Sequence, residues 1–277
     1  MRAERKGKET MAKKKIGFIG CGSMARAMIG GLLASGALRP EEIVASNRTA
    51  AKLEAARAEF GIAAAADNRE AAAECEFLVL AVKPQSGAEV IAEIAGAVPE
   101  NCVVVSLLAG WTLAKLRGAF GGDRKLVRAM PNTPALVREG MTALCPNGLV
   151  TPGEREELLR LFGSFGRAEV VGEPVMDAVV AVSGSSPAYV FLMIEAMADA
   201  AVAGGMKRAQ AYTFAAQAVL GSAKMVLETG KHPAELKDMV CSPAGTTIEA
   251  VAALERGGFR SAVIDAMRAC MDKSRSM

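Results

Sequence analysis

Two glycines and a small residue stand at a fixed spacing near the start of the chain, in the run Gly20-Cys21-Gly22-Ser23-Met24-Ala25. A short apolar segment, Ile16–Ile19, precedes this run, and a segment that favours helix follows it. Gly20 permits a tight turn, Gly22 lets the backbone approach a pyrophosphate, and Ala25 lets the helix pack closely on the strand. A diphosphate would then lie at the helix N-terminus, where free N–H groups point at it. An ordinary glycine turn is the alternative, and the flanking strand and helix favour dinucleotide binding.

The end of the second predicted strand indicates which dinucleotide fits. Sites for NAD carry Asp or Glu there, which accept hydrogen bonds from the ribose hydroxyls. This chain has Asn47 and Arg48 at that point and no acid. A guanidinium can bind a 2′-phosphate through two hydrogen bonds, whereas a carboxylate would repel it. Asn47 and Arg48 therefore favour NADP(H) and still admit NAD(H), although an arginine in solvent is the alternative interpretation.

Two further loops follow predicted strands and face the same edge of the sheet, where open α/β sheets bind ligands, and a third loop after a later strand could shape the site. Lys83-Pro84-Gln85 places a lysine near phosphate or ribose, and Leu108-Ala109-Gly110 lets the backbone approach the ribose or nicotinamide. In Met130-Pro131-Asn132-Thr133-Pro134, two prolines make a stiff loop that presents polar groups. A purely structural turn explains this last loop equally well.

Two loops in the second half of the chain lead into helices. Ser183–Tyr189 has small hydroxyl residues before a helix that begins at Pro187, and helix capping accounts for them. Val240–Thr247 contains hydroxyls, a glycine and no acid directly before a helix, so it suits a small carboxylate. A capping turn without a ligand is the alternative. The single histidine, His232, precedes a proline, so neither a histidine-based metal site nor a Ser-His-Asp triad is expected.

Short apolar segments with helical patterns between them would position these loops. The predicted strands are Ile16–Ile19, Ile43–Ser46, Phe77–Val82, Cys102–Leu107 and Lys125–Ala129, and the predicted helices are Met24–Ser35, Ala50–Phe60, Arg69–Ala73, Ala88–Ile94 and Leu113–Phe120. Two more short strands, Thr142–Leu144 and Glu169–Val171, are expected at the sheet edge on either side of a helix at Pro152–Phe165. This alternation predicts an α/β fold with a Rossmann-type, doubly wound, mostly parallel sheet and helices on both faces.

From Met176 onwards, strand signals vanish and helical patterns take over. The expected helices are Pro187–Ala203, Lys207–Glu228, Pro233–Met239, Thr247–Glu255 and Phe259–Lys273, with glycines between them. The first of them is apolar almost all round, and a second subunit would supply the surface that buries it. We therefore expect a disordered extension at residues 1–14, a dinucleotide-binding domain at 15–172 and an all-helical domain at 173–277.

The composition argues against several classes of protein. The chain has 277 residues and a formal net charge of +3, with no basic stripe among aromatics that would bind nucleic acid. Its charged start lacks the apolar segment of a secretory signal, and Met11 offers a second start. No apolar run of about 18 residues is free of charge, Gly or Pro. Six scattered cysteines without C-x-x-C spacing indicate reduced thiols. These features predict a cytoplasmic protein without nucleic-acid or membrane partners.

Taken together, these segments closely resemble the Δ1-pyrroline-5-carboxylate reductase family. The matching segments are Ile16–Ala25, Ala81–Gln85, Arg128–Pro134, Ser183–Tyr189 and Leu236–Thr247. They follow the family's order, and the similarity runs from about Lys15 to Ser274. Many dehydrogenases share the glycine motif, whereas the run Ser242-Pro243-Ala244-Gly245-Thr246-Thr247 is nearly specific to this family.

The resemblance implies an N-terminal NAD(P)-binding domain and an all-helical domain that interlocks with its twin in a homodimer, with assembly into a larger ring left open. It implies reduction of the cyclic imine L-Δ1-pyrroline-5-carboxylate to L-proline, the final step of proline biosynthesis. Thr247 would be the catalytic residue, with its hydroxyl on the imine nitrogen. The implied substrate contacts are Glu173, Ser242, Gly245, Thr246 and Thr247, and the implied dinucleotide contacts are Gly20, Gly22, Ser23, Met24, Asn47, Arg48, Asn68, Ala81, Val82, Lys83 and Ala109.

The chemistry of an imine agrees with the residues that the sequence offers. A protonated imine already accepts hydride well, so orientation over the nicotinamide supplies much of the rate and no strong general acid is needed. Some positions depart from the family's usual residues, namely Ser23, Leu107, Leu108, Ser186 and Ala244. Ala244 replaces a common glycine, and a positive φ there would cost an alanine about 1 kcal/mol.

Other activities compete with this interpretation. The nearest rival is a β-hydroxyacid dehydrogenase, but those enzymes resemble one another in carrying a catalytic lysine on the first long helix of the second domain. The corresponding segment here, Pro187–Gly204, contains no lysine. A reductase of another cyclic imine and a dinucleotide-binding protein without turnover remain as alternatives.

Overall fold

The computed structural model describes residues 14–73 and 75–277. These residues fall into two compact units, one formed by the chain up to Gly184 together with Ser274–Met277, and the other by Ser185–Lys273. Residues 1–13 of the predicted extension lie outside the described residues, and Lys14 begins the first strand. The predicted domain boundary between residues 172 and 173 stays a prediction.

In the described part of the chain, the first unit contains a sheet of eight strands in the order β3-β2-β1-β4-β5-β6-β7-β8. Neighbouring strands are parallel except β6 and β7, which are antiparallel. The strands are β1 (Lys14–Ile19), β2 (Ile43–Ser46), β3 (Ala63–Ala64), β4 (Cys75–Leu80), β5 (Val103–Ser106), β6 (Leu126–Met130), β7 (Gly140–Pro146) and β8 (Gly166–Val170). The order of β1 to β6 is that of a doubly wound dinucleotide-binding fold, and it confirms the predicted fold class.

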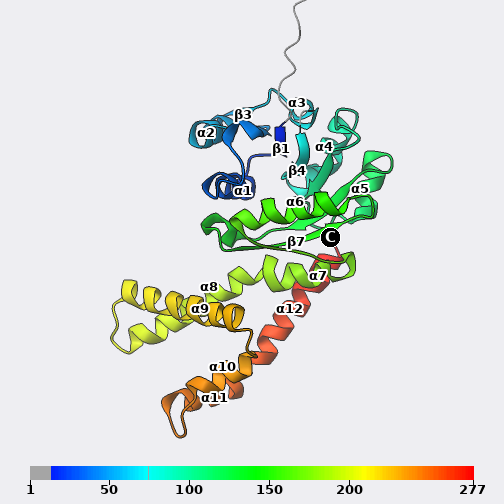
Figure 1. The fold of residues 1–277 in the computed structure, drawn as a ribbon. Helices are drawn as coiled ribbons and strands as arrows, with labels where there is room; N and C mark the ends of the chain where they lie inside the picture. Colours follow the sequence, from blue (N-terminus) through cyan, green and yellow to red (C-terminus); the bar gives the residue numbers. More distant parts are fainter. Residues whose placement is uncertain (1–13, 74) are drawn as a thin grey trace, which may run out of the picture. The chain divides into compact units, whose positions relative to one another are not determined.

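Alternate residues of the strands enter two hydrophobic cores, one on each face of the sheet. In β1, Phe18 belongs to one core and Ile19 to the other, and both side chains are fully buried. The covering helices surround the sheet in Figure 1. Helices α1 (Ser23–Ala34), α2 (Ala50–Phe60) and α6 (Pro152–Phe162) supply one core, while α3 (Asn68–Ala73), α4 (Gly87–Ile94) and α5 (Leu113–Phe120) supply the other. Burial on both faces explains why the central strands β1, β2, β4 and β5 are largely apolar.

The departures from the predicted elements concern short segments. Strand β3 was not predicted because it consists of two alanines, a residue depleted in strands. Strand β7 is longer than predicted and runs antiparallel to β6. The predicted helix to Phe165 ends at Phe162 and continues as a 3₁₀ turn. The short helical segments are η1 (Pro40–Glu42), η2 (Pro84–Ser86), η3 (Thr133–Val137), η4 (Gly163–Phe165), η5 (Glu173–Val175), α7 (Met176–Val179) and the π-helix η6 (Val180–Gly184).

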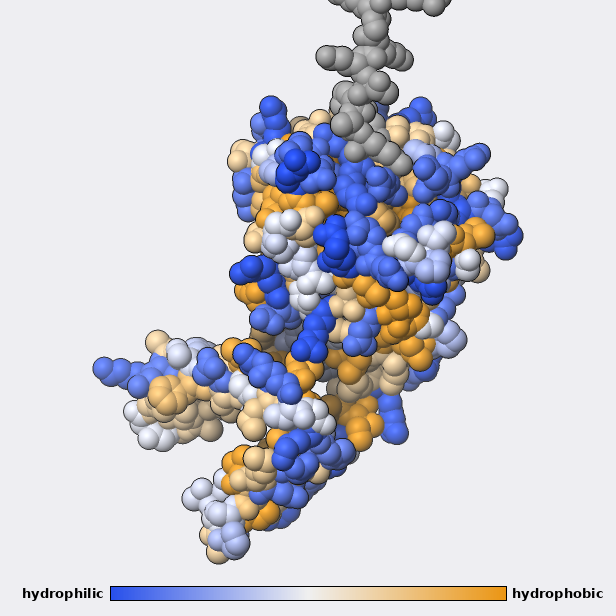
Figure 2. Space-filling model, viewed as in Figure 1, coloured by the Kyte–Doolittle hydropathy of each residue, from blue (hydrophilic) through white to orange (hydrophobic). Residues whose placement is uncertain are grey.

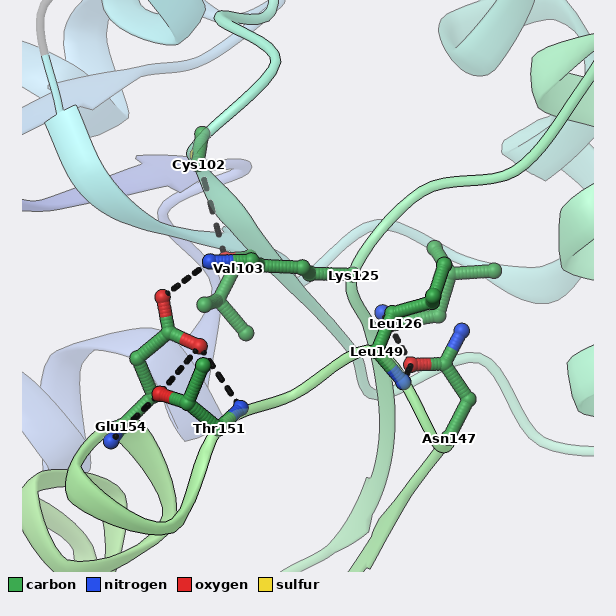
Figure 3. A network of polar contacts seen from close by, with 8 residues as sticks. All are labelled: Cys102, Val103, Lys125, Leu126, Asn147, Leu149, Thr151 and Glu154. Carbon is green, nitrogen blue, oxygen red and sulfur yellow. Dashed lines mark hydrogen bonds and ion pairs between the residues drawn. The ribbon is translucent and has the colours of Figure 1, made fainter.

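A polar network ties the start of α6 to strand β6 (Figure 3). The Thr151 hydroxyl accepts from the Glu154 N–H at 3.3 Å, and the Glu154 carboxylate accepts from the Thr151 N–H at 2.9 Å. Lys125, next to β6, reaches the same carboxylate at 2.6 Å. Burial opposes ionisation of Glu154, but Lys125 and the Thr151 donors outweigh it and hold the Glu154 pKa below its usual value. The reciprocal capping of Thr151 and Glu154 therefore also fixes where the helix meets the sheet.

The second unit is helical throughout its described length. Its helices are α8 (Ser186–Ala203), α9 (Arg208–Thr229), α10 (Pro233–Val240), α11 (Thr246–Arg256) and α12 (Phe259–Arg275), the last of which ends in the first unit. Large apolar side chains stay exposed on these helices, and orange patches mark such residues in Figure 2. Phe191 is 62% exposed, Leu192 68% and Phe214 61%. A single copy of these helices thus leaves much of its apolar surface uncovered.

The structure can be compared with two expectations drawn from composition, on the cysteines and on apolar stretches. All six cysteines carry free thiols, as the spacing predicted. One helical stretch, Glu173–Ala203, is long and apolar enough by length and composition to cross a membrane, although only 6% of its apolar window is buried. The sequence did not predict this stretch because Gly184 and Pro187 interrupt it. In the structure Gly184 ends the π-helix η6, Ser185 forms a bend, and Pro187 lies in the first turn of α8. Length and composition alone are weak grounds for a membrane helix, since apolar core helices pass the same test.

Candidate active site

A cavity of about 550 Å³ lies in the first unit, at the carboxyl ends of β1, β2 and β4. Ligands bind at this edge in open α/β sheets, where the strand order reverses. The cavity is lined by the glycine turn, the ends of β2 and β4, and the first turns of the following helices. Its lining residues are Gly20, Gly22, Ser46, Asn47, Arg48, Thr49, Lys52, Ala66, Asp67, Asn68, Ala81, Val82, Lys83, Ser86, Glu89, Val90 and Glu93.

The protein itself requires a glycine at position 20. Gly20 has a φ of +95°, a conformation that residues with a side chain rarely adopt. A Cβ there would also lie 2.8 Å from the main-chain oxygen of Ala81 and 3.0 Å from Cγ1 of Val82. The Gly20 N–H donates to the main-chain oxygen of Ser46 at 2.9 Å, which joins the turn after β1 to the end of β2. The close approach of three strand ends therefore accounts for this glycine.

Gly22 has a different explanation. It precedes α1 with φ −81° and ψ −175°, an extended conformation open to any residue. None of the described atoms lies within 4 Å of the place where its Cβ would be. No side chain caps α1, so the first N–H groups of this twelve-residue helix remain available to a ligand. Open space over a helix N-terminus fits the diphosphate of a dinucleotide.

The end of β2 combines a closed turn with two free cations. The side-chain oxygen Oδ1 of Asn47 accepts from the Cys21 N–H at 3.0 Å, and Nδ2 donates to the Thr49 oxygen at 2.9 Å. Asn47 thus holds the glycine turn against the β2–α2 loop. Arg48 is exposed, and among the described residues none forms an ion pair with Arg48 or Lys52. These two cations can receive a 2′-phosphate.

A second polar group crosses the far wall of the cavity. The Ser46 hydroxyl donates to Oδ1 of Asn68 at 2.7 Å, and Nδ2 of Asn68 donates to the Glu93 carboxylate at 2.7 Å. Asn68 was a predicted dinucleotide contact, whereas Ser46, Lys52 and Glu93 were not predicted. The sequence marks Ser46 only as the last residue of a strand. No sequence pattern marks Glu93, because packing alone determines which face of the short helix α4 lines the cavity.

The predicted dinucleotide residues divide into two groups. Those that line the cavity are Gly20, Gly22, Asn47, Arg48, Asn68, Ala81, Val82 and Lys83. Ser23 and Met24 begin α1 directly after Gly22, and Ala109 follows β5; none of these three lines the cavity. Their contact with a dinucleotide stays a prediction.

Glu173 is held within the first unit. Its Oε1 accepts from the Leu113 N–H at the start of α5 and from Nη1 of Arg128 on β6, both at 2.8 Å. The Arg128 side chain is only 11% exposed, so this ion pair is better shielded than most surface pairs. The carboxylate thereby connects η5 to β6 and α5, which the sequence did not predict. A substrate contact of Glu173 stays a prediction.

The loop between α10 and α11 carries the predicted substrate hydroxyls of the second unit. Ala244 has a φ of +56°, the left-handed conformation that the missing family glycine implied. Gly245 caps α11, and a Cβ on it would overlap the Ser242 hydroxyl. Among the described residues, none bonds to the side chains of Ser242, Thr246 or Thr247. Three hydroxyls and the first N–H groups of an eleven-residue helix are thus available at one turn.

Known proteins share this combination of a dinucleotide-binding sheet and a helical unit. Residues 173–277 match the family model "Pyrroline-5-carboxylate reductase dimerisation", and residues 15–110 match "NADP oxidoreductase coenzyme F420-dependent". The chain is 57% identical to a pyrroline-5-carboxylate reductase of Escherichia coli over 96% of this chain and 98% of that protein.

Solved structures agree with this relation. A pyrroline-5-carboxylate reductase from Coxiella burnetii matches with a TM-score of 0.89 and 36% identity over 95% of this chain and 98% of that one. The Plasmodium falciparum pyrroline carboxylate reductase, solved with NADP bound, matches with a TM-score of 0.85 and 30% identity over 96% and 98%. The cavity, the helical unit and these relatives together establish that the chain belongs to the pyrroline-5-carboxylate reductase family.

Proposed function

We propose that this protein reduces L-Δ1-pyrroline-5-carboxylate to L-proline with NADPH, the final step of proline biosynthesis. The observation that carries the proposal is the 57% identity to the Escherichia coli reductase over nearly the full length of both chains. When bound, NADPH would supply a hydride to the carbon of the protonated imine, whose nitrogen retains its proton, so that one imine, one proton and one NADPH yield one proline and one NADP⁺. The chain's own residues bind and orient the two partners.

The cofactor end of the site is the cavity at β1, β2 and β4. The open turn at Gly22 receives the diphosphate, and Lys83 lies beside the same cavity. Arg48 and Lys52 bind the 2′-phosphate, which gives NADPH an advantage over NADH. No carboxylate stands at the tip of β2 to repel that phosphate. Ser23, Met24 and Ala109 complete the contacts in this proposal.

The substrate end of the site is the turn before α11. The substrate carboxylate binds the free N–H groups around Gly245 and Thr246, helped by the Ser242 hydroxyl and the positive end of the helix. The Thr247 hydroxyl accepts a hydrogen bond from the protonated imine nitrogen and so directs the imine carbon. Glu173 offers Oε2 to the substrate in this proposal, because its Oε1 already accepts hydrogen bonds from Arg128 and from the Leu113 N–H.

The proposed assembly is a homodimer interlocked through the helices of residues 173–277, with a larger ring as a further step. Exposed Phe191, Leu192 and Phe214 support it, because a second copy would remove this apolar surface from water. The same need for a partner explains the apolar stretch Glu173–Ala203 without a membrane. We propose a cytoplasmic protein that has neither nucleic acid nor membrane as a partner.

The deciding experiment mixes the full chain with NADPH and L-Δ1-pyrroline-5-carboxylate and follows the loss of reduced-nicotinamide absorbance, with proline measured as product. Stoichiometric proline is expected. NADPH binding without proline formation would overturn the proposed substrate but leave the cofactor assignment. The variant Thr247→Ala tests the role of the Thr247 hydroxyl, and it should lower kcat far more than it weakens NADPH binding. An unchanged kcat would remove Thr247 from the mechanism.

A further inference from the structure

Three side chains form a hydrogen-bonded series across one wall of the cavity. Glu93 on α4 accepts from Nδ2 of Asn68 at 2.7 Å, and Oδ1 of Asn68 accepts from the Ser46 hydroxyl at 2.7 Å. Ser46 is only 1% exposed, and its main-chain oxygen accepts from the Gly20 N–H at 2.9 Å. All four residues line the cavity. The series therefore connects helix α4 to the glycine turn.

We propose that Glu93 is a positioning residue for the dinucleotide, because it fixes the orientation of the Asn68 amide and so the places of the N–H and the lone pair that remain for the cofactor. The inference rests on the proposed assignment of this cavity to NADP(H). It adds a residue that itself need not touch the cofactor, and it predicts how cofactor affinity responds when that residue changes.

Glu93 can set the orientation of Asn68 because the two groups differ in what they offer. An ionised carboxylate only accepts hydrogen bonds, whereas an asparagine amide donates at nitrogen and accepts at oxygen. Nδ2 of Asn68 must therefore face Glu93. The Ser46 hydroxyl does not by itself set the orientation of the Asn68 amide, because it can donate to Oδ1 or accept from Nδ2. One N–H and one lone pair of Asn68 then remain, in fixed places, for a ligand.

The backbone of Glu93 is held independently of its carboxylate. Nε of Arg69 on α3 donates to the Glu93 main-chain oxygen at 3.0 Å, and this bond survives any change of the side chain. The Glu93 side chain is half-buried at the cavity rim, not part of the hydrophobic core. A substitution at this position should therefore leave the packing of α3 against α4 in place.

The proposal expects NADPH to bind more weakly when the Glu93 carboxylate is removed, whereas electrostatics alone predicts tighter binding. NADPH is a polyanion, so a nearby carboxylate weakens its binding and removal of that carboxylate should tighten it. Glu89 provides the matched control. It lies one turn earlier on α4, lines the same cavity, and has no hydrogen bond or ion pair within the described part of the chain.

The test measures the Kd of NADPH on the full chain by nicotinamide fluorescence, together with KM for NADPH and kcat. Glu93→Ala should raise Kd and KM by about fivefold to tenfold, the size of one lost charge-assisted hydrogen bond, with kcat nearly unchanged. Glu93→Gln keeps an acceptor for Nδ2 and should bind as well as the wild type or better. Glu89→Ala should bind equally or more tightly.

Two further variants secure the result against a folding defect. Glu93→Lys offers only donors, so it should turn the amide over and weaken binding although it adds a positive charge. Glu93→Ala placed on Asn68→Ala should cause no further loss, because Glu93 acts through Asn68. Unchanged or tighter binding by Glu93→Ala or Glu93→Lys would overturn the proposal, as would additive losses in the double variant. A wild-type chain that fails to bind NADPH would overturn the cofactor assignment as well.

Discussion

Ala244 occupies a conformation that suits glycine better. At φ +56° an alanine is strained by about 1 kcal/mol. Glycine would remove that strain, but it adds roughly 0.4–1 kcal/mol of conformational entropy to the unfolded chain. The two terms nearly cancel, so replacing Ala244 with glycine should hardly change the free energy of unfolding. The turn that leads to Gly245 and Thr246 has the left-handed conformation at position 244 although the residue is an alanine.

We expect Ala244→Gly to leave kcat/KM for the imine equal or higher, with an unfolding midpoint close to that of the wild type. Steady-state kinetics and thermal unfolding of both proteins measure this. Ala250→Gly, in the exposed interior of α11, is the matched control, and it should lower stability by about 1 kcal/mol. A sharp loss of activity in Ala244→Gly would show that the turn is built differently from this description.

The cations at the end of β2 give a prediction about cofactor preference. Arg48→Ala should raise KM for NADPH by about tenfold or more and leave KM for NADH nearly unchanged, because only the former has a 2′-phosphate. Lys52→Ala should show a smaller effect of the same kind. Arg57→Ala, on α2 but outside the cavity, should change neither. Equal losses for both cofactors would contradict a phosphate-specific role of Arg48.

At this scale the sequence predicted cavity residues that directly follow apolar strands, but it missed Ser46 at the end of a strand and Glu93 on a helix face. Gly20, Asn47 and Arg48 could be predicted because they follow apolar strands directly. Glu93 could not, since only the packing of α4 decides that its side chain reaches Asn68. The ion pair of Arg128 and Glu173 was equally invisible, because its partners lie 45 positions apart in the chain.

At the scale of elements, α6 is anchored to the sheet by charges. Glu157 on α6 accepts from Arg160 at 2.8 Å and pairs with Lys15 on β1 at 3.0 Å. The Arg160 hydrogen bonds outweigh burial and, with Lys15, lower the Glu157 pKa to about 2. Because the folded pKa lies below the usual value of 4.5, the stabilisation is complete above that value and is lost as the pH falls towards 2.

We therefore expect Glu157→Gln to destabilise the protein by about 1 kcal/mol at pH 7, a value reduced by solvent screening of a partly exposed group. The difference from the wild type should shrink as the pH drops below about 4.5. Thermal unfolding midpoints across this pH range measure it. Glu156→Gln, the adjacent position without an ion pair among the described residues, should differ little from the wild type at any pH. A difference independent of pH would assign the effect to packing.

The element order could be predicted because apolar strands and glycine turns are local signals. Strands β1, β2, β4 and β5 each carry an unbroken apolar run, and the run in β6 is interrupted only by Arg128. Strand β3 is too short and too alanine-rich for such a signal. The antiparallel direction of β7 depends on where the chain returns after η3, and no local pattern encodes that.

At the scale of the whole molecule, the exposed apolar side chains of the second unit support the proposed homodimer. Leu192→Glu should shift the protein from dimer to monomer, because it places a charge on a leucine that is 68% exposed in one copy. Light scattering coupled to size-exclusion chromatography measures the mass. Leu149→Glu, at an exposed leucine of the first unit, should leave the dimer intact. A dimer that persists in Leu192→Glu would place the interface elsewhere.

The open space over Gly22 has a consequence for experiments on the assembled protein. Since the fold makes no demand on that position, Gly22→Ala should yield a normally folded and normally assembled subunit that excludes the cofactor by a single methyl group. Mixed with wild-type subunits, it would form hybrids in which half of the sites are silent. The activity of those hybrids would then show whether each site turns over independently or depends on cofactor binding at the neighbouring site.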